Sequence, residues 1–287
     1  MVLGHWLFLF DLFWILKQYS PRMKIKQVVV VTKLHFHDLR KTTKHIHKET
    51  LKEVIHLLES LDVRFRVVDR NKLKNPLKTD LIITVGGDGT VLAASHFAGS
   101  ALLFGINSAP QTSTGYFCHA NPKNFKRRLK EIFSGKRKPV ELPRLEIRIS
   151  GVKLPYCALN DMLFACRLQG ETARYQIRIG LKKEEQKSSG VWVATGAGST
   201  AALYSAGGKK DSPFSKRIQY FVREPFHYPK NNYHLVKGFL RPGQKVTITS
   251  EMRSGMIFID GGKLYFHVPR YAKVTARGGV RPLKIFL

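Results

Sequence analysis

The first half of the chain alternates short apolar runs with longer amphipathic segments. Runs rich in aliphatic and β-branched residues predict four strands, at residues 28–32, 64–68, 81–85 and 101–106. Apolar residues at helical spacing, from the candidate cap Asp38 to residue 61, predict a helix, and two more helices are predicted at 91–97 and 124–133. Strands that alternate with helices predict a Rossmann-like, doubly wound parallel sheet.

Beyond Pro139 the pattern changes to short apolar runs with a single intervening helix, predicted at 199–206. The runs predict eight strands, at residues 145–150, 158–165, 175–181, 191–195, 245–250, 256–259, 264–267 and 273–276. This spacing favours a mainly antiparallel β domain. The predicted fold class is therefore α/β, with a parallel-sheet domain over 23–137 and a β-rich domain over 138–287, whose C-terminal tail returns to the first domain.

The first 22 residues do not fit either domain. Residues 6–16 are apolar except for Asp11, which is too short a run for the roughly 20 residues of a membrane-spanning helix. No positive charge precedes the run and no small-residue cleavage site follows it, so a secretory signal is not indicated. We interpret Met23 as the working start and 1–22 as an extension outside the fold; a weak membrane-surface anchor is the alternative.

The chain is strongly basic, with 49 Lys and Arg against 20 Asp and Glu and a formal net charge of +29. Such a surplus attracts polyanions of any kind. The charge is spread along the 287 residues, whereas a dedicated nucleic-acid arm usually forms a concentrated block. A generally basic surface is therefore favoured over a specific nucleic-acid footprint.

Cysteine and histidine usage argues against disulfides and metal centres. The three cysteines, Cys118, Cys157 and Cys166, form no CxxC pair and no disulfide framework, so we expect a reducing compartment such as the cytoplasm. The histidines lack carboxylate or cysteine neighbours at ligand spacing, so they are interpreted as solvated surface residues.

The strongest chemical motif is Gly-Gly-Asp-Gly-Thr at 86–90, directly after a predicted buried strand. Ligands of open α/β sheets bind at such strand ends, and glycines let backbone N–H groups approach a phosphate. Asp88 would repel phosphate, which makes sense if it takes a proton from a hydroxyl or holds Mg²⁺. The alternative is a tight turn capped by Asp88, with Thr90 starting a helix.

Three weaker features follow in the second half. A Gly-Ala-Gly-Ser-Thr-Ala turn at 196–201 fits either a dinucleotide fingerprint or an ordinary strand-to-helix turn. Asn160 and Asp161 interrupt an apolar strand-like run, as a buried hydrogen-bonded pair or as ligand contacts at a cleft. Asp260 begins an Asp-Gly-Gly sequence that reads first as a hairpin turn.

Together these motifs resemble those of the NAD kinases, from about Lys24 to the C-terminus. The family's order of motifs is kept here as 86–90, Gly-Ile-Asn ending at Asn107, the pair at 160–161, the turn at 195–208 and the hairpin at 260–261. Ala202 replaces the usual tyrosine and Ser189 the usual aspartate, which is similar to the mitochondrial-type branch. Diacylglycerol and sphingosine kinases share only the first motif.

The resemblance implies transfer of a phosphoryl group from ATP to the adenosine 2′-hydroxyl of NAD, with Mg²⁺ accompanying ATP. It implies that Asp88 is the catalytic base and that the phosphates lie on Gly86, Gly87, Gly89 and Thr90. The implied NAD-binding residues are Asn160, Asp161, Arg174, Lys187, Ser189, Thr200, Ala201 and Ser205, with Asn107 and Asp260 as further candidates. It also implies a homo-oligomer without a specific nucleic-acid partner or a membrane span.

Two other functions stay open at this stage. A lipid kinase would use the same glycine-rich turn with a basic face on a membrane, although the Asn160–Asp161 pair and the turn at 196–201 argue against it. A non-catalytic nucleic-acid-binding protein on this scaffold would leave Asp88 without a role on DNA phosphate.

Overall fold

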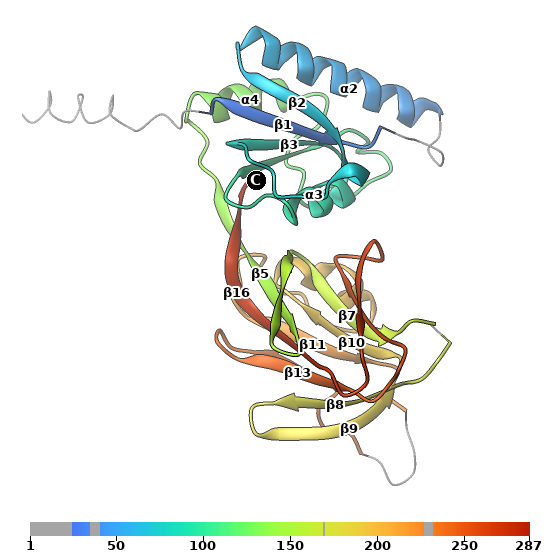
Figure 1. Cartoon of the computed structure of the whole chain (residues 1–287). Helices are drawn as coiled ribbons and strands as arrows, with labels where there is room; N and C mark the ends of the chain where they lie inside the picture. The colour runs from blue at the N-terminus through green and yellow to red at the C-terminus, as the bar shows by residue number, and fades with distance from the viewer. Residues whose placement is uncertain (1–24, 35–40, 169, 227–231) are drawn as a thin grey trace, which may run out of the picture.

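The computed structural model describes residues 25–34, 41–168, 170–226 and 232–287. It contains two stacked domains, the N-terminal one at the top of Figure 1 and the β-rich one below it. The predictions for Met23, for the segment 1–22 and for Asp38 lie outside the described residues.

The N-terminal domain is a doubly wound sheet, as predicted. Its parallel strands run in the order β2 (Arg64–Asp69), β1 (Gln27–Thr32), β3 (Leu81–Gly86) and β4 (Leu102–Asn107). Helices α2 (Lys41–Ser60) and α4 (Phe125–Phe133) bury their apolar stripes on one face, and α3 (Asp88–Ser95) packs on the other. Residues of β3 are fully buried because helices cover both faces of the sheet.

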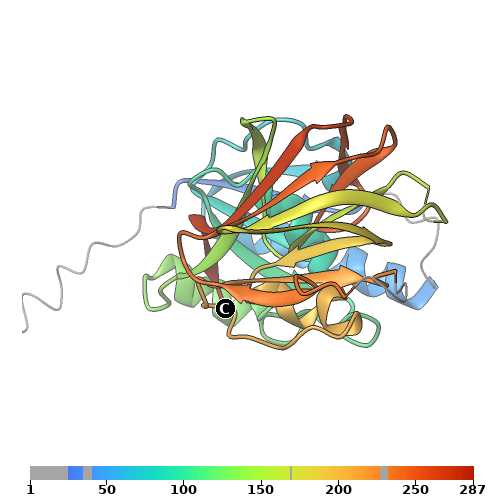
Figure 2. The same cartoon turned by 90° about the horizontal axis from the view of Figure 1, so that it is seen from below.

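The C-terminal domain is a sandwich of two mainly antiparallel sheets, which Figure 2 shows from the end opposite the N-terminal domain. One layer contains β5 (Val140–Ile149), β6 (Val152–Ala158), β8 (Ala173–Ile179), β9 (Lys182–Ser188), β13 (Lys245–Ser250) and β16 (Lys273–Phe286). The other contains β7 (Asp161–Cys166), β10 (Gly190–Ala194), β11 (Ile218–Arg223), β12 (Lys237–Leu240), β14 (Gly255–Ile259) and β15 (Leu264–Val268). Inward-facing residues such as Phe164 and Tyr175 form the core between them.

Strand β16 joins the two domains into one continuous sheet. Along most of its length it pairs with β5 and β13, and its last residues, Ile285 and Phe286, pair in parallel with β4. Two residues of the C-terminal domain, Leu159 and Ala197, are buried in the same apolar cluster as Val91 of α3. The domains therefore share a packed boundary beside the start of α3.

Several local predictions were wrong. The run 158–165 is not one strand, because β6 ends at Ala158 and β7 begins at Asp161. The helix expected at 199–206 is a 3₁₀ turn, Ala197–Thr200, followed by the one-turn helix α5, Ala202–Ser205. Strands β6, β9, β11 and β12 were not predicted. His47 is not a solvated surface residue: it is buried, and its ring nitrogens contact the hydroxyls of Thr32 and Ser108 at 2.9 and 2.7 Å. Among the described residues, no helix combines the length and apolarity needed to cross a membrane.

Candidate functional site at the domain boundary

The turn 86–90 lies at the carboxyl end of β3 and starts α3. The Asp88 carboxylate does not point to open solvent: its two oxygens accept hydrogen bonds from the backbone N–H groups of Tyr116 and Phe117, each at 2.8 Å. A carboxylate oxygen has more than one lone pair, so both oxygens retain acceptor capacity for a substrate hydroxyl. Asp88 is thus held in one orientation at the domain boundary.

Asn107 shapes the loop that holds Asp88. Its side-chain nitrogen donates to the Ser113 carbonyl at 3.0 Å, and its side-chain oxygen accepts from the Ala109 N–H at 3.0 Å. The side chain is buried, and a Cβ at Gly115 would lie 2.4 Å from its nitrogen. The structure therefore gives Asn107 a role in loop geometry.

The glycines of the turn differ in what they face. A Cβ on Gly86 would lie 2.4 Å from the Thr90 hydroxyl oxygen, and one on Gly87 would lie 2.4 Å from that of Ser113. Close packing within the protein accounts for both. Gly89 is exposed, and its nearest neighbour to an added Cβ is the Arg70 guanidinium at 3.5 Å. Among these three glycines, only Gly89 lines the pocket described next.

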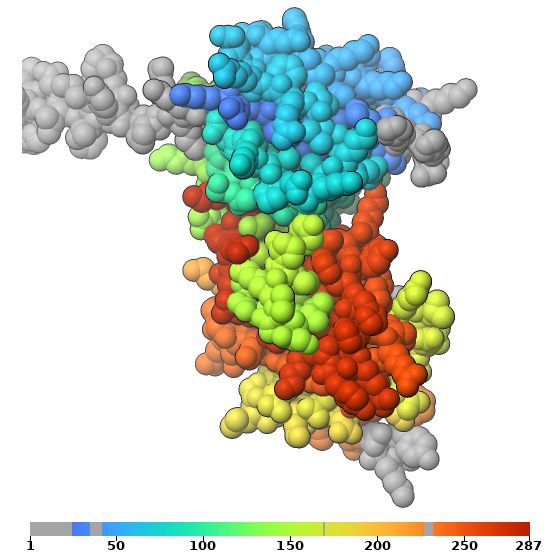
Figure 3. Space-filling model, viewed as in Figure 1, coloured from blue at the N-terminus to red at the C-terminus, as the bar shows by residue number. Residues whose placement is uncertain are grey.

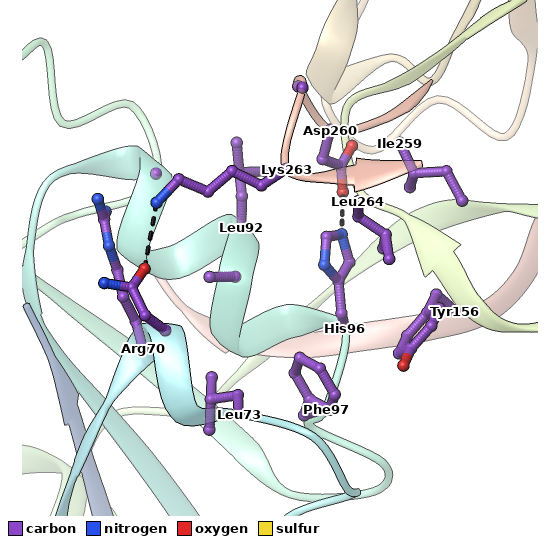
Figure 4. Close-up of a pocket in the computed structure, with 15 residues that line it drawn as sticks. Arg70, Leu73, Leu92, His96, Phe97, Tyr156, Ile259, Asp260, Lys263 and Leu264 are labelled. Atoms are coloured by element: carbon purple, nitrogen blue, oxygen red, sulfur yellow. Dashed lines mark hydrogen bonds and ion pairs between the residues drawn. The ribbon is translucent and has the colours of Figure 1, made fainter. Parts of the chain in front are cut away.

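A pocket of about 640 Å³ lies between the domains. Its upper wall comes from α3 and from η1 (Arg70–Lys72), and its lower wall from the β14–β15 hairpin and Tyr156 of β6. Figure 3 shows this hairpin, in orange-red, rising against the cyan N-terminal domain, and Figure 4 shows the lining side chains. The pocket is basic at one end, around Arg70 and Lys263, and apolar and aromatic at the other, around Phe97 and Tyr156.

The basic end brings Arg70 and Lys263 together near Lys33, and Asp69 is the carboxylate that acts on both Arg70 and Lys263. Arg70 donates to the Thr90 hydroxyl at 3.3 Å, but its Nε is buried without a hydrogen-bond partner. The Lys263 ammonium donates to the Asn71 side-chain oxygen at 3.1 Å. Burial lowers the pKa of Arg70, and burial with repulsion from Arg70 and Lys33 lowers that of Lys263. An anion here would relieve this repulsion.

Asp260 connects the two domains at the wall of the pocket through hydrogen bonds. Its side chain is fully buried and accepts hydrogen bonds from three consecutive backbone N–H groups, those of residues 159–161, at 2.7–3.0 Å. It also contacts His96 Nε2 at 2.8 Å, which ties the C-terminal domain to the end of α3. These bonds take the amides of 159–161 out of a strand ladder, which explains the break between β6 and β7. Asp260 therefore does not only form the hairpin turn; its side chain also holds the segment 159–161 and the end of α3 in place.

Asn160 and Asp161 lie at this break. The Asn160 side-chain oxygen is buried with no partner, and buried polar atoms are rarely left so unless a ligand or water completes them. Asp161 is buried near Asp260, and burial together with that charge raises the pKa of Asp161 to about 8. Gly198 packs so closely that a Cβ would lie 2.0 Å from the Asn160 carbonyl oxygen. The pair therefore meets the turn at 196–201.

The remaining predicted residues fall into two groups. Thr200 and Ala201 are half-buried and Ser205 is exposed, all following the turn that contacts Asn160. Arg174 and Lys187 pair across β8 and β9, and Ser189 follows β9. Figure 1 shows β8 and β9 at the end of the molecule farthest from α3. One copy of the chain does not bring this second group to Asp88.

Sequence reasoning missed Arg70, His96 and Lys263. Arg70 directly follows β2, so the rule that ligands bind at the carboxyl ends of parallel strands could have identified it. Lys263 follows the Asp-Gly-Gly hairpin, and His96 ends α3; their contacts join residues far apart in the sequence. In the part of the chain that the structure describes, no three His, Cys, Asp or Glu side chains gather as a metal site requires.

Comparisons with known proteins agree with the motif resemblance. The family model described as the ATP-NAD kinase N-terminal domain matches residues 15–137. A probable NADH kinase of Oryza sativa subsp. japonica is 32% identical over 265 residues, covering 84% of this chain and 82% of that protein. The NADH kinase of Arabidopsis thaliana is 31% identical over 266 residues, covering 84% of each.

Solved structures share the fold. A crystal structure of an NAD kinase from Archaeoglobus fulgidus in complex with ATP has a TM-score of 0.70 at 22% identity, over 91% of this chain and 93% of that one. A yeast NADH kinase complexed with NADH has a TM-score of 0.73 at 19% identity, over 91% and 83%. With the sequence relatives spanning most of their length and the motifs in order, the chain belongs to the family of ATP-NAD kinases.

Proposed function

We propose that this protein transfers the terminal phosphoryl group of ATP to the adenosine 2′-hydroxyl of NAD, forming NADP and ADP. The observation that carries the proposal is the start of α3, where Asp88 is held by two amides while the next residue, Gly89, opens onto a basic pocket. Phosphoryl transfer asks an enzyme mainly to position groups and to neutralise charge, and this junction supplies both.

The phosphoryl donor would occupy the pocket between the domains. Its triphosphate would lie at the basic end, beside Arg70, Lys263 and the Gly89 amide, and its base against the apolar side chains around Tyr156. Mg²⁺ would arrive as the magnesium complex of ATP, since its phosphates supply the oxygens that Mg²⁺ prefers. The protein's cations would oppose the charge that the phosphates develop.

The acceptor hydroxyl would meet Asp88 on the other side of Gly89. The 2′-oxygen attacks the terminal phosphorus of ATP. The bond between that phosphorus and the bridging oxygen, which leaves with ADP, breaks, and the hydroxyl proton passes to the Asp88 carboxylate. The unpartnered side-chain oxygen of Asn160 is suited to accept a hydrogen bond from the dinucleotide. Asp161, Thr200, Ala201 and Ser205 would complete this acceptor side.

A homo-oligomer belongs to the same proposal. Arg174, Lys187 and Ser189 lie at the β8–β9 end, away from Asp88 of their own chain, so contacts of theirs with the dinucleotide would come from a second copy. Sedimentation velocity tests this: a monomer at concentrations where the enzyme turns over would remove these three residues from the proposed site.

The acceptor's redox state is the finer question, because two relatives are named NADH kinases. NADH carries the same adenosine ribose as NAD, so the proposed chemistry at Asp88 applies to both. No finding favours the lipid kinase or the nucleic-acid-binding alternatives. Given the free cysteines, a reducing compartment such as the cytoplasm remains the expected location.

The test is mass-spectrometric detection of NADP or NADPH after incubation with ATP, Mg²⁺ and either NAD or NADH. Asp88→Asn should lower turnover by about 100-fold or more while leaving NAD affinity nearly unchanged, since the amide is a poor base of the same size, although its single acceptor oxygen keeps only one of the two backbone hydrogen bonds. Exposed Asp62→Asn is the matched control. Near-normal turnover of Asp88→Asn would remove the base role, and phosphorylation of diacylglycerol without NADP would overturn the function.

A further inference from the structure

A second cavity of about 480 Å³ lies behind His96, which forms a wall of both cavities. It is bounded by the loop 99–101 and Pro76 of the N-terminal domain and by β5, β6 and β16 of the C-terminal domain. Three of its lining side chains are cationic: Arg144, Arg281 and Lys284. Its lining contains no Asp or Glu.

Arg144 is the buried member of this set. It is 5% exposed, and its guanidinium donates only to backbone carbonyls, that of Ser95 at 3.0 Å and that of Arg281 at 2.6 Å. A buried charge without a counter-ion is costly, and burial lowers the pKa of this side chain. The protein therefore holds a cation at the cavity whose charge no carboxylate contact balances.

The strand beside Arg144 is distorted toward the same cavity. The pairing of β16 with β5 shifts register between Val280 and Leu283, and Arg281 has a left-handed backbone with φ of 45°. Bulges of this kind redirect side chains. The bulge exposes Arg281, and Lys284 follows it on the same strand.

Among the described residues, no ion pair involves any of these three cations. No carboxylate of a described residue lies within 4.0 Å of their charged nitrogens. Glu141 lies opposite Lys284 in the register of β5 and β16, but no ion pair joins them. The nearest buried carboxylate, Asp260, is engaged by His96 and by three amides. Asp260 and Glu141 therefore offset part of the positive charge of the cavity, but neither carboxylate forms an ion pair with the three cations.

We propose that this cavity is a regulatory site for a compact phosphate-bearing anion, distinct from the donor pocket. Three cations in one cavity match an anion of at least two charges, and phosphate groups carry about two and accept several charge-assisted hydrogen bonds. The volume exceeds that of a single phosphate, so a pyrophosphate or a small phosphate ester fits better. The apolar remainder of the lining, including Pro155 and Pro282, suits the organic part of an ester.

The position of the cavity gives it access to the acceptor side. His96, its shared wall, contacts Asp260 at 2.8 Å, and Asp260 holds the backbone amides of Asn160 and Asp161. Because His96 forms a wall of the cavity, an anion bound there would alter the packing of its ring and, through the ring, its contact with Asp260. Occupancy of the cavity should therefore change the binding of the dinucleotide.

Calorimetric titration of pyrophosphate, without ATP or NAD, tests the site independently of turnover. We use Lys263→Met protein, in which the donor pocket is weakened, and compare it with the same protein carrying Arg281→Gln and Lys284→Gln. The substitutions Arg281→Gln and Lys284→Gln together should weaken the binding of pyrophosphate by at least about tenfold. The control substitutions Lys245→Gln and Lys273→Gln remove the same charge from exposed positions elsewhere and should not weaken it. Arg144 is left intact because it also supports the fold.

Equal loss with the control pair, or no binding at millimolar pyrophosphate, would overturn the site. Citrate binding as tight as that of pyrophosphate would overturn its preference for phosphate. In wild-type enzyme, saturating pyrophosphate should change the KM for NAD at least twofold, and Arg281→Gln with Lys284→Gln should abolish this change. An unchanged KM would overturn the regulatory role. A protein without kinase activity but with the predicted binding would count only against the proposed function.

Discussion

The two sides of the α3 N-terminus are built on opposite principles. On the Asp88 side, the protein satisfies its own groups: two amides hold the carboxylate, and Asn107 holds the loop that supplies them. On the Arg70 side, repulsion between cations persists, and the buried Arg70 Nε has no hydrogen-bond partner. Asp88 and the loop that holds it have all these hydrogen bonds without a ligand, whereas the Arg70 end does not.

This difference indicates which part of the site is fixed before the substrates bind and which part is stabilised by the bound substrate. A catalytic carboxylate gains from being fixed before the substrate arrives, since its orientation then costs nothing at the moment of reaction. A polyphosphate subsite gains from unpaired cations, because the ligand itself removes their repulsion. The pocket side should therefore respond to ATP and to salt, and the Asp88 side should not.

Asp260 supports both sides, so its replacement should have the largest effect. Asp260→Asn leaves amides and His96 without a full set of acceptors, which should cost about 3–5 kcal/mol of stability. The fall in Tm, measured by calorimetry, should be about 10 °C. Asp62→Asn is a close control, because Asp62 is exposed and has φ of 51° against 49° at Asp260. Equal shifts in Tm for Asp260→Asn and Asp62→Asn would show that the buried hydrogen bonds of Asp260 do not stabilise the fold.

Asp161 should make stability depend on pH. Its pKa is raised to about 8, so folding favours the protonated form, and stability should fall as pH rises from about 4 to 8. Asp161→Asn removes this penalty and should gain on the order of a few kcal/mol at pH 8 and little at pH 4.5. Tm measured against pH, with exposed Glu185→Gln as control, tests this. If the curves of Tm against pH ran parallel for the wild type and Asp161→Asn, Asp161 would not be the source of the pH dependence.

Lys263 separates the two sides kinetically. Lys263→Met should raise the KM for ATP by about tenfold through the loss of one phosphate contact, with little change in the KM for NAD. The wild-type KM for ATP should also rise more steeply with salt than that of the variant. Lys237→Met, an exposed lysine on β12, is the control. A rise in the KM for NAD alone would reverse the assignment of the two sides.

Gly89 should show the smallest effect. A methyl group there would lie 3.5 Å from the Arg70 guanidinium, an ordinary contact at the edge of the donor pocket. Gly89→Ala should raise the KM for ATP by about threefold, equivalent to roughly 0.6 kcal/mol. Gly170→Ala, at a position with open space around it, should leave the KM unchanged. An unaffected Gly89→Ala enzyme would move the triphosphate away from this amide.

The sequence allowed prediction of what depends on local pattern. Strands β1, β3 and β4 follow from their apolar runs, and the turn at 86–90 from its glycines. Strand β9, an edge strand paired with β8, reads Lys-Lys-Glu-Glu-Gln-Lys-Ser and carries no apolar pattern, because its two buried positions, Gln186 and Ser188, are polar. Its hydrogen bonds to β8 define it, and a window of sequence cannot display them.

The candidate site was only partly predictable for the same reason. Asp88 stands inside its motif, whereas the Lys263–Asn71 contact joins residues 192 positions apart, and the His96–Asp260 contact joins residues 164 apart. The break at Asn160 likewise results from a side chain 100 residues away. A motif predicts chemistry that depends on neighbouring residues in the sequence. The pocket was not predicted because it forms where two domains, distant in the sequence, meet.

The pairing of Ile285 and Phe286 with β4 has a consequence for biosynthesis. On the ribosome, the N-terminal domain emerges first, yet the edge of its sheet at Leu103 and Phe104 of β4 is covered only after the whole C-terminal domain has been translated. Until then the exposed edge could recruit foreign strands. The nascent protein is therefore expected to need chaperone protection, and its two lobes should melt in a single cooperative transition.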